Sequence, residues 1–176
     1  MSDPSITAYN SSQIAALTSS QLDGLSSTDL QSLTTSQIQA LQQSQLNQLT
    51  TVQMGILLTT QVAALKVLQV SSLSTGNLNA LTETQFQSLT TNQIGSLKPI
   101  QIANLETTDL QALSSTQLQA VTIHGISALR TDEIVALTTN QVASLTQSQI
   151  AVLTSTQLGA LESQDLKVLS VSALTG

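Results

Sequence analysis

His124 is the only histidine in the chain, and the chain has no cysteine. A Ser-His-Asp type of catalytic site needs a base that a third group orients, and a transition-metal site needs three or four nitrogen or sulfur ligands. His124 has no second or third ligand of this kind, so the sequence predicts neither type of site. Because His124 stands beside Gly125, we expect it to lie in a distorted turn.

Arg130, Asp132 and Glu133 form the densest group of charged residues. We interpret the two acids as solvated charges in the first turn of a helix, where they complement the helix dipole. The remaining acids are scattered without the spacing of a calcium loop, and the glycines form no phosphate-binding cluster. We therefore expect no catalytic, cofactor-binding or metal-binding residues, and no enzyme activity.

The overall charge excludes further classes of partner. The net charge is -6, and the basic residues are Lys66, Lys98, Arg130 and Lys167. Nucleic acids and anionic membranes attract basic patches, so we expect binding to neither. No apolar run approaches the roughly 18–20 residues that span a bilayer, and residues 1–4 do not begin a classical signal peptide. We expect no membrane insertion.

An eight-residue unit repeats along nearly the whole chain. Its anchor position starts at Ile6, recurs every eighth residue as far as Leu174, and is apolar at all 22 occurrences. A second apolar position, the leucine position, starts at Tyr9 and is Leu at 19 of 21 occurrences. A tandem repeat of this kind determines the architecture, because one unit alone cannot bury its apolar residues.

The residues between the two apolar positions indicate a helix start in every octad. If Thr18 is the N-cap, Gln21 occupies N3, and Ser/Thr-x-x-Gln is the capping-box sequence. Leu17 and Leu22 then occupy the two positions of a hydrophobic staple. The cap position is Ser or Thr in 13 of 21 octads, and N3 is Gln or Glu in 15 of 21, so the signal extends over the array. Pro99 falls at N1, where proline is well tolerated.

Three structures compete for such an octad. In a continuous helix, eight residues leave the apolar pair about 80° out of register per repeat, so no stripe forms. In a β-solenoid, residues three apart point to opposite faces of a strand, and each unit needs a corner. A series of short helices satisfies the capping and apolar positions together, although such helices are too short to be stable alone.

We predict an all-α solenoid: a superhelical coil of very short helices, one per octad, around a continuous aliphatic core. A β-solenoid is the alternative. Residues 1–9 would form an N-terminal cap and first partial repeat, and residues 10–176 a continuous octad-repeat solenoid that belongs to a longer array. The residue before each leucine position is usually small, as in Ala16 and Ala40, which would let adjacent turns approach closely.

A few stretches depart from the octad. Extra apolar residues occur at Val52, Leu68, Ile100 and Ile123. They indicate either repeat decay or a lateral contact with another chain or coil. Residues 167–174 echo residues 66–73 at a separation that is not a multiple of eight, which indicates a frame shift near Val171.

The unit resembles the octapeptide tandem arrays, of the form Leu-Thr-Thr-x-Gln-Ile/Val-x-Ala-Leu, of large bacterial proteins that are secreted or surface-associated. Residues 89–97 and 137–145 carry the resemblance most clearly. It implies a structural role as an elongated spacer, stalk or filament-forming element, with end-to-end or lateral self-association, and it favours a secreted or cell-surface location over a cytoplasmic one. A protein- or glycan-binding repeat module and an effector or export-related segment are the alternatives.

Overall fold

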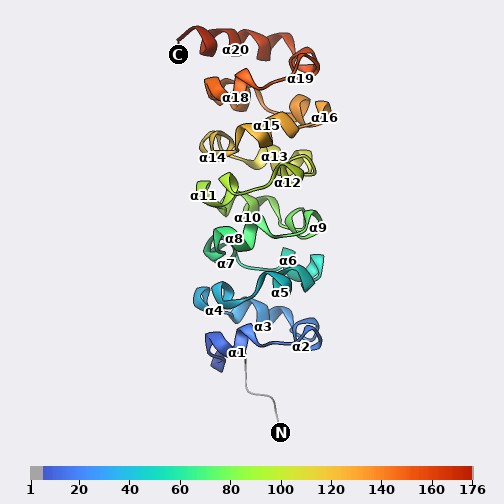
Figure 1. Cartoon of the computed structure of the whole chain (residues 1–176). Coiled ribbons are helices and arrows are strands. Elements are labelled where there is room, and N and C mark those ends of the chain that lie inside the picture. The colour runs from blue at the N-terminus through green and yellow to red at the C-terminus, as the bar shows by residue number, and fades with distance from the viewer. Residues whose placement is uncertain (1–5, 176) are drawn as a thin grey trace. The chain divides into compact units, whose positions relative to one another are not determined.

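A computed structural model describes the backbone of residues 6–175 and the side chains of residues 6–169. The described residues form short helices and no strand, so the predicted all-α solenoid is confirmed and the β-solenoid is excluded for this part of the chain (Figure 1). The chain divides into two compact units, Met1–Leu89 and Thr90–Gly176. Each unit is described separately below.

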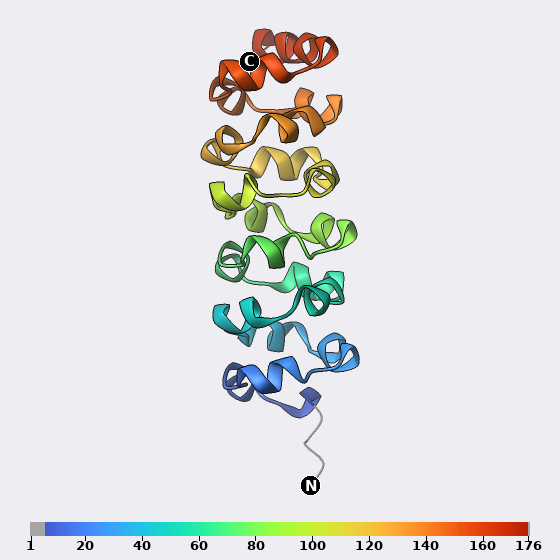
Figure 2. The ribbon, with the colours of Figure 1, turned by 90° about the vertical axis from the view of Figure 1, so that its right-hand side faces the viewer.

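The first unit contains a 3-10 turn and ten α-helices. They are η1 (Ile6–Ala8), α1 (Ser11–Ala15), α2 (Ser19–Asp23), α3 (Ser27–Ser32), α4 (Thr35–Ala40), α5 (Gln43–Gln48), α6 (Thr51–Gly55), α7 (Thr59–Ala64), α8 (Val67–Ser71), α9 (Thr75–Leu78) and α10 (Glu83–Ser88). Most helices pack on the third helix along the chain: α1 on α4, α4 on α7, α7 on α10, and likewise α2 on α5 and α5 on α8. Successive helices therefore follow a coil, which the blue-to-green part of Figure 2 shows from a second side.

The second unit repeats this arrangement. Its helices are α11 (Thr91–Gly95), α12 (Pro99–Ile102), α13 (Thr107–Ala112), α14 (Ser115–Ala120), α15 (Ile123–Ala128), α16 (Thr131–Ala136), α17 (Thr139–Ser144), α18 (Gln147–Ala151), α19 (Ser155–Ala160) and α20 (Ser163–Thr175). Helix α11 packs on α14, α12 on α15, α13 on α16, and α17 on α20. In both units, helices therefore pack on the third helix along the chain.

The leucine position ends most helices without a glycine. Leu41 ends α4 with φ -57° and ψ 134°, an extended backbone, and Leu33 ends α3 with φ -61° and ψ 128°. Among the described residues no φ is positive, so the left-handed glycine cap that ends many helices is not used here. The next residue is already the extended N-cap of the following helix, as Thr34 is for α4. The chain changes direction over two extended residues.

The core consists of the two apolar positions. Anchor residues in the interior of the array are 0–1% exposed, including Phe86 and Met54, and residues at the leucine position are 2–5% exposed there. Each octad therefore contributes two buried side chains to an aliphatic core. Full burial of one such side chain stabilises a fold by roughly 1.5–3 kcal/mol, which a helix of six residues cannot obtain alone.

Helix α20 departs from the octad. It spans 13 residues, whereas every other α-helix of the described residues spans four to six. Lys66 is the N-cap of α8, but Lys167 lies inside α20. Helix α20 runs through this stretch without a new helix start, so the octad is interrupted there, and the frame shift near Val171 stays a prediction. The N3 position that would follow Ser170 holds Ala173, which cannot accept a hydrogen bond from a cap amide.

Candidate functional site: the glutamine contacts between coils

The N3 glutamine first stabilises the start of its own helix. In α4, the backbone N–H of Thr34 donates to Gln37 Oε1 at 2.8 Å, and the backbone N–H of Gln37 donates to Thr34 Oγ1 at 3.3 Å. This reciprocal pair satisfies two amides that a helix start otherwise leaves without partners. Where the cap residue has no suitable oxygen, the glutamine half remains: the backbone N–H of Leu58 donates to Gln61 Oε1 at 2.8 Å.

The other end of the same carboxamide joins the helix to the coil before it. Gln61 Nε2 donates to the carbonyl oxygens of Leu30 and Leu33, both at 2.8 Å. These acceptors are the anchor and leucine positions 31 and 28 residues earlier. The same pair of bonds recurs from Gln37, Gln45, Gln53, Gln69 and Gln85 in the first unit, and from Gln141, Gln149 and Gln157 in the second.

We call this buried carboxamide with its two acceptors a rung. The glutamines of these rungs are at most 8% exposed, so each rung places a polar group between coils with its donor and acceptor both used. Asn77 makes the same two contacts, from Nδ2 to the carbonyl oxygens of Leu46 at 2.9 Å and Leu49 at 3.2 Å. A buried amide that makes all its bonds stabilises a fold, whereas an unsatisfied one costs about 1–3 kcal/mol.

A second set of bonds runs in the opposite direction along the chain. In several octads the residue after the anchor is Gln or Asn and donates to a carbonyl 25 residues later: Gln39 to Ala64 at 3.0 Å, and Asn47 to Ser72 at 2.7 Å. Gln31, Gln111 and Gln119 do the same. The acceptor lies at the position before the leucine position, and in four of these five bonds it belongs to Ala or Ser.

Together the two sets of bonds determine the size of a coil. They join residues separated by 25 to 31 positions, which is more than three octads and fewer than four. Small residues allow close approach, as predicted: a Cβ added to Gly55 would lie 3.1 Å from the carbonyl oxygen of Ala80, and one added to Gly95 would lie 3.0 Å from that of Ala120. In both cases the two residues are 25 positions apart.

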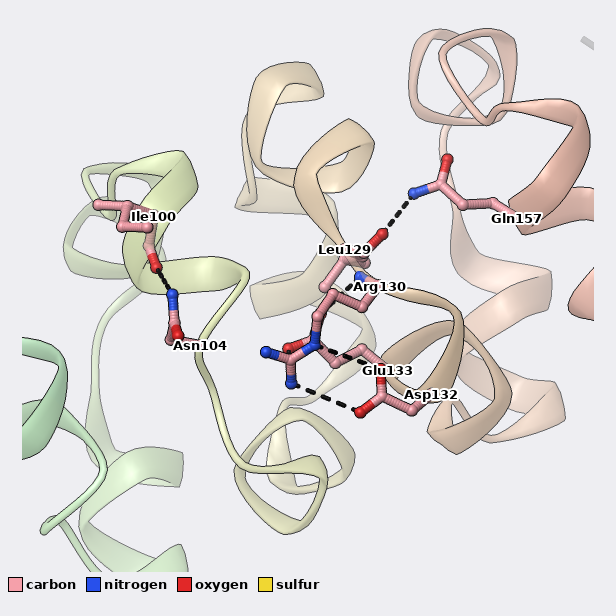
Figure 3. Close-up of polar contacts among 7 residues, drawn as sticks. All are labelled: Ile100, Asn104, Leu129, Arg130, Asp132, Glu133 and Gln157. Carbon is pink, nitrogen blue, oxygen red and sulfur yellow. Dashed lines mark hydrogen bonds and ion pairs between the residues drawn. The ribbon is translucent and has the colours of Figure 1, made fainter.

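The charged group of the second unit lies at the start of α16 (Figure 3). Arg130 is the N-cap, and its backbone N–H donates to Glu133 Oε2 at 2.7 Å. The guanidinium Nε donates to Asp132 Oδ1 at 3.3 Å, and Nη2 lies 3.1 Å from Glu133 Oε1. Asp132 is solvated as expected, but the side chain of Glu133 is 0% exposed. The interpretation of both acids as solvated charges is therefore wrong for Glu133.

Glu133 occupies N3, the position at which other octads place the glutamine of a rung. Burial raises the pKa of the Glu133 carboxyl, and the backbone N–H and charge of Arg130 only partly oppose this. Glu133 Oε1 accepts no hydrogen bond from any described residue, although it forms the ion pair with Arg130. A carboxylate has no proton to donate to the preceding coil. For Asp132, the hydrogen bond from Arg130 lowers the pKa.

His124 lies in a regular helix. It is exposed at N2 of α15, and Thr122 caps that helix by accepting from the backbone N–H of Gly125 at 3.1 Å. The predicted distorted turn at His124 is therefore wrong. Gly125 stands at N3 because of its neighbours: a Cβ there would lie 2.8 Å from Val121 Cγ1 and 3.2 Å from Ile102 Cγ1. The β-branched Val121, which replaces the usual leucine, fills the space that a glutamine stem needs.

The extra apolar residues found in the sequence are exposed. Val52 is 72%, Leu68 69%, Ile100 62% and Ile123 41% exposed. Val52 and Leu68 belong to different helices, α6 and α8, whereas Ile100 and Ile123 belong to α12 and α15, which pack on each other. The lateral contact stays a prediction.

Among the described residues, no three His, Cys, Asp or Glu side chains gather closely enough to hold a metal ion. No helix among those described residues is long and apolar enough to cross a membrane.

Comparison with known families agrees with the geometry of the second unit. Residues 102–139 and 126–163 both match the ALTTAQ repeat. Residues 102–163 are thus similar to a tandem array of ALTTAQ repeats. The second match begins three octads after the first, as a tandem octapeptide array requires, and the ALTTAQ motif places its glutamine at the N3 position of the rungs. No curated protein matches the chain.

Proposed function

We propose that the octad array is a structural element, a stiff spacer or stalk, and that it performs no catalysis. The observation that supports this proposal is the series of rungs between successive coils. Within each unit, buried carboxamides such as Gln61 and Gln149 bond successive coils over an aliphatic core. A series of nearest-neighbour contacts of this kind resists bending, because bending must open several rungs and expose core residues together.

The proposal includes a bacterial origin and a secreted or surface-associated location. Its support is the resemblance of the octad to arrays of large bacterial proteins, together with a composition free of cysteine and poor in charge. Fractionation of the source cell checks the location: an antibody raised against the array should detect it in the medium or at the cell surface. Detection in the cytoplasm alone would contradict this part of the proposal.

Stiffness can be measured directly because the chain has no cysteine of its own. Ser20 and Thr84 lie within the first unit, are exposed and can be replaced by cysteine for paired dyes. Single-molecule energy transfer should then give one narrow distance distribution at picomolar concentration. A Gln53→Glu variant removes the two donors of a buried rung and should broaden the distribution. A broad distribution in the unmodified protein would overturn the stiff-spacer proposal.

A further inference from the structure

One buried rung position of the second unit holds a carboxyl group in place of a carboxamide. In a complete rung of this unit, Gln157 Nε2 donates from α19 to the carbonyl oxygen of Leu129 at 2.7 Å, as Figure 3 shows, and to that of Ile126 at 3.3 Å. Glu133 occupies the same N3 position in α16, and its side chain is 0% exposed. The position is therefore buried like a rung but has a different chemical group.

The two carboxyl oxygens of Glu133 have different surroundings. Oε2 accepts from the backbone N–H of Arg130 at 2.7 Å, which is the cap bond that Oε1 makes in a rung glutamine. Oε1 therefore takes the place of the glutamine Nε2. This oxygen is buried and accepts no hydrogen bond from a described residue, while Arg130 Nη2 lies 3.1 Å from it.

One of the carbonyl oxygens that this rung would join also lacks a donor. The residues 31 and 28 positions before Glu133 are Ile102 and Leu105, which are 1% and 2% exposed. The carbonyl oxygen of Ile102 accepts from the backbone N–H of Leu105 at 3.2 Å. Within the described part of the chain, no group donates to the carbonyl oxygen of Leu105. Two buried acceptors thus belong to one rung, and each acceptor left without a donor costs free energy.

We propose that Glu133 forms a proton-dependent contact between coils: the carboxyl group takes up a proton from solvent and donates it from Oε1 to the carbonyl oxygen of Leu105, and loss of the proton opens the contact. A protonated carboxyl group has one O–H to donate, which matches the one carbonyl without a donor. Oε2 keeps its cap bond in both states. This inference goes beyond the spacer, because it makes one contact between coils respond to pH.

The charges around Glu133 decide the direction of the response. Helix α16 packs on α13 and α19. Helix α13 carries Asp109 and has Glu106 as its N-cap, whereas α19 has no ionisable side chain. Burial raises the pKa of the Glu133 carboxyl, the backbone N–H and charge of Arg130 oppose this rise, and the charge of Asp132 adds to it.

The sign of the effect follows from this raised pKa. A group whose pKa is raised by folding stabilises the folded state in its protonated form, and that contribution is lost as pH rises through the folded pKa. The contact between Glu133 and Leu105 should therefore be closed in acid and open at neutral pH, with a midpoint above the ordinary glutamic acid value of 4.5.

The sequence allows the carbonyl group of Leu105 to be observed directly. Glutamate follows leucine at two places, Leu105–Glu106 and Leu161–Glu162. Protein labelled with 13C at the leucine carbonyls and with 15N at the glutamate amides therefore gives two carbonyl–amide signals in an NMR spectrum. The carbonyl shift of Leu105 should titrate with a midpoint above 4.5, and the midpoint should match that of the Glu133 carboxyl carbon.

Two variants separate this titration from others. Glu133→Gln supplies an amide donor at every pH, so the Leu105 carbonyl should stay near its acid value, while the Leu161 signal should not change. The variant keeps Glu106, so the difference between its titration and that of the unmodified protein isolates Glu133. The matched control is Glu83→Gln, which removes an exposed acid from α10 in the first unit and should leave both signals unchanged.

The second variant moves the midpoint without touching the carboxyl group. Arg130→Thr provides the usual cap residue and removes the charge that favours the carboxylate. The Leu105 titration should therefore shift to higher pH. Closure of the contact should also slow amide exchange in α16 on the order of 10-fold relative to the intrinsic rate. The amides of α4, which the Gln37 rung holds, should show no such change.

Three outcomes would overturn the inference: a Leu105 carbonyl shift that does not titrate, a Leu105 titration that Glu133→Gln leaves intact, or a midpoint that Arg130→Thr leaves in place. If Glu133→Gln fails to fold, Arg130→Thr still decides between the outcomes, and circular dichroism checks the fold of each protein. The stiff-spacer proposal fails separately, because its dye pair at residues 20 and 84 lies within the first unit and reports nothing about Glu133.

Discussion

Gln149 Nε2 donates to the carbonyl oxygen of Val121 at 2.8 Å, across 28 residues of sequence. The backbone N–H of Thr146 donates to Oε1 of the same side chain at 3.0 Å. One carboxamide therefore starts a helix and holds that helix against the coil before it. Glutamate could perform the first task but not the second, because it has no donor when ionised.

The first prediction concerns the donor of one rung. Gln61→Glu keeps the bond from the amide of Leu58 but places a buried carboxylate against the carbonyl oxygens of Leu30 and Leu33. We expect the free energy of unfolding to fall by about 3 kcal/mol, because charged groups left without donors cost more than neutral ones. Urea denaturation followed by circular dichroism measures this.

The control for this prediction is the same change in the first coil. Gln13→Glu also keeps a cap bond, but Gln13 is exposed and its Nε2 bonds to no described residue, so stability should stay within about 0.5 kcal/mol of the parent. Equal losses at residues 13 and 61 would show that the effect arises at the cap and not between coils.

The second prediction concerns Glu133, whose pKa is raised by burial above its ordinary value of 4.5. A group whose pKa is raised by folding stabilises the folded state when protonated, and this contribution is lost as pH rises through the folded pKa. Glu133→Gln should therefore stabilise the protein at pH 7, and the gain should shrink as pH falls toward 4.5. The charges that act on Glu133 are those of Arg130 and Asp132 at the start of the same helix. A gain independent of pH would contradict the explanation.

The third prediction has the opposite sign at the same position of a different octad. Asp29 is at N3 of α3 in the first coil, and hydrogen bonds from the hydroxyl and amide of Ser26 lower its pKa. A lowered pKa stabilises the folded state above the unfolded pKa, and the contribution is lost as pH falls through the folded value. Asp29→Asn should thus destabilise at pH 7 and have little effect at pH 2. Thermal melts at both pH values compare it with Glu133→Gln.

The fourth prediction tests the pairing of Val121 with Gly125. Gly125→Gln alone should destabilise the protein, because its Cβ would lie 2.8 Å from Val121 Cγ1. Val121→Leu restores the usual leucine and removes the branch. In the double variant the new glutamine can form a rung, so the two changes should be strongly non-additive, by about 1–3 kcal/mol. A double-mutant cycle in urea measures this coupling, and additive effects would show that Ile102 alone excludes the side chain.

The fifth prediction uses two glycines. Nothing lies within 4 Å of a Cβ added to Gly159 in α19, so Gly159→Ala should stabilise by about 0.5–1 kcal/mol through helix propensity alone. Gly95→Ala has the same propensity gain but places a Cβ 3.0 Å from the carbonyl oxygen of Ala120. Its gain should be smaller or negative. Thermal unfolding of the pair separates propensity from coil spacing.

Most of the fold can be predicted from the sequence of the octad. The apolar positions predict the core, and residues such as Thr18 and Gln21 predict where each helix begins. The role of Gln61 between coils was missed, although a signal was present: N3 is Gln in 14 octads and Glu in one. A bond to the cap amide alone would tolerate both residues, so this excess indicates a need for the amide donor.

The number of octads in a coil was not predictable for a physical reason. Every octad carries the same residues at the same positions, so a coil of three or of four octads would bury the same pattern. The number of octads per coil depends on which residues the side chains can reach, as in the hydrogen bond from Gln39 to the carbonyl oxygen of Ala64. The burial of Glu133 was missed because the octad sequence does not show how far a charged N3 residue is covered: Asp29 is half-buried in the first coil, whereas Glu133 is fully buried.

Every rung glutamine donates to a carbonyl that precedes it in sequence, as Gln37 donates to Tyr9 at 2.8 Å. A ribosome releases the N-terminus first, so each newly made coil emerges when its acceptors are already in place. Assembly of the array can therefore keep pace with translation, one octad at a time, and needs no segment that is still to be made for these bonds. In every rung, the acceptor is therefore synthesised before the glutamine that donates to it.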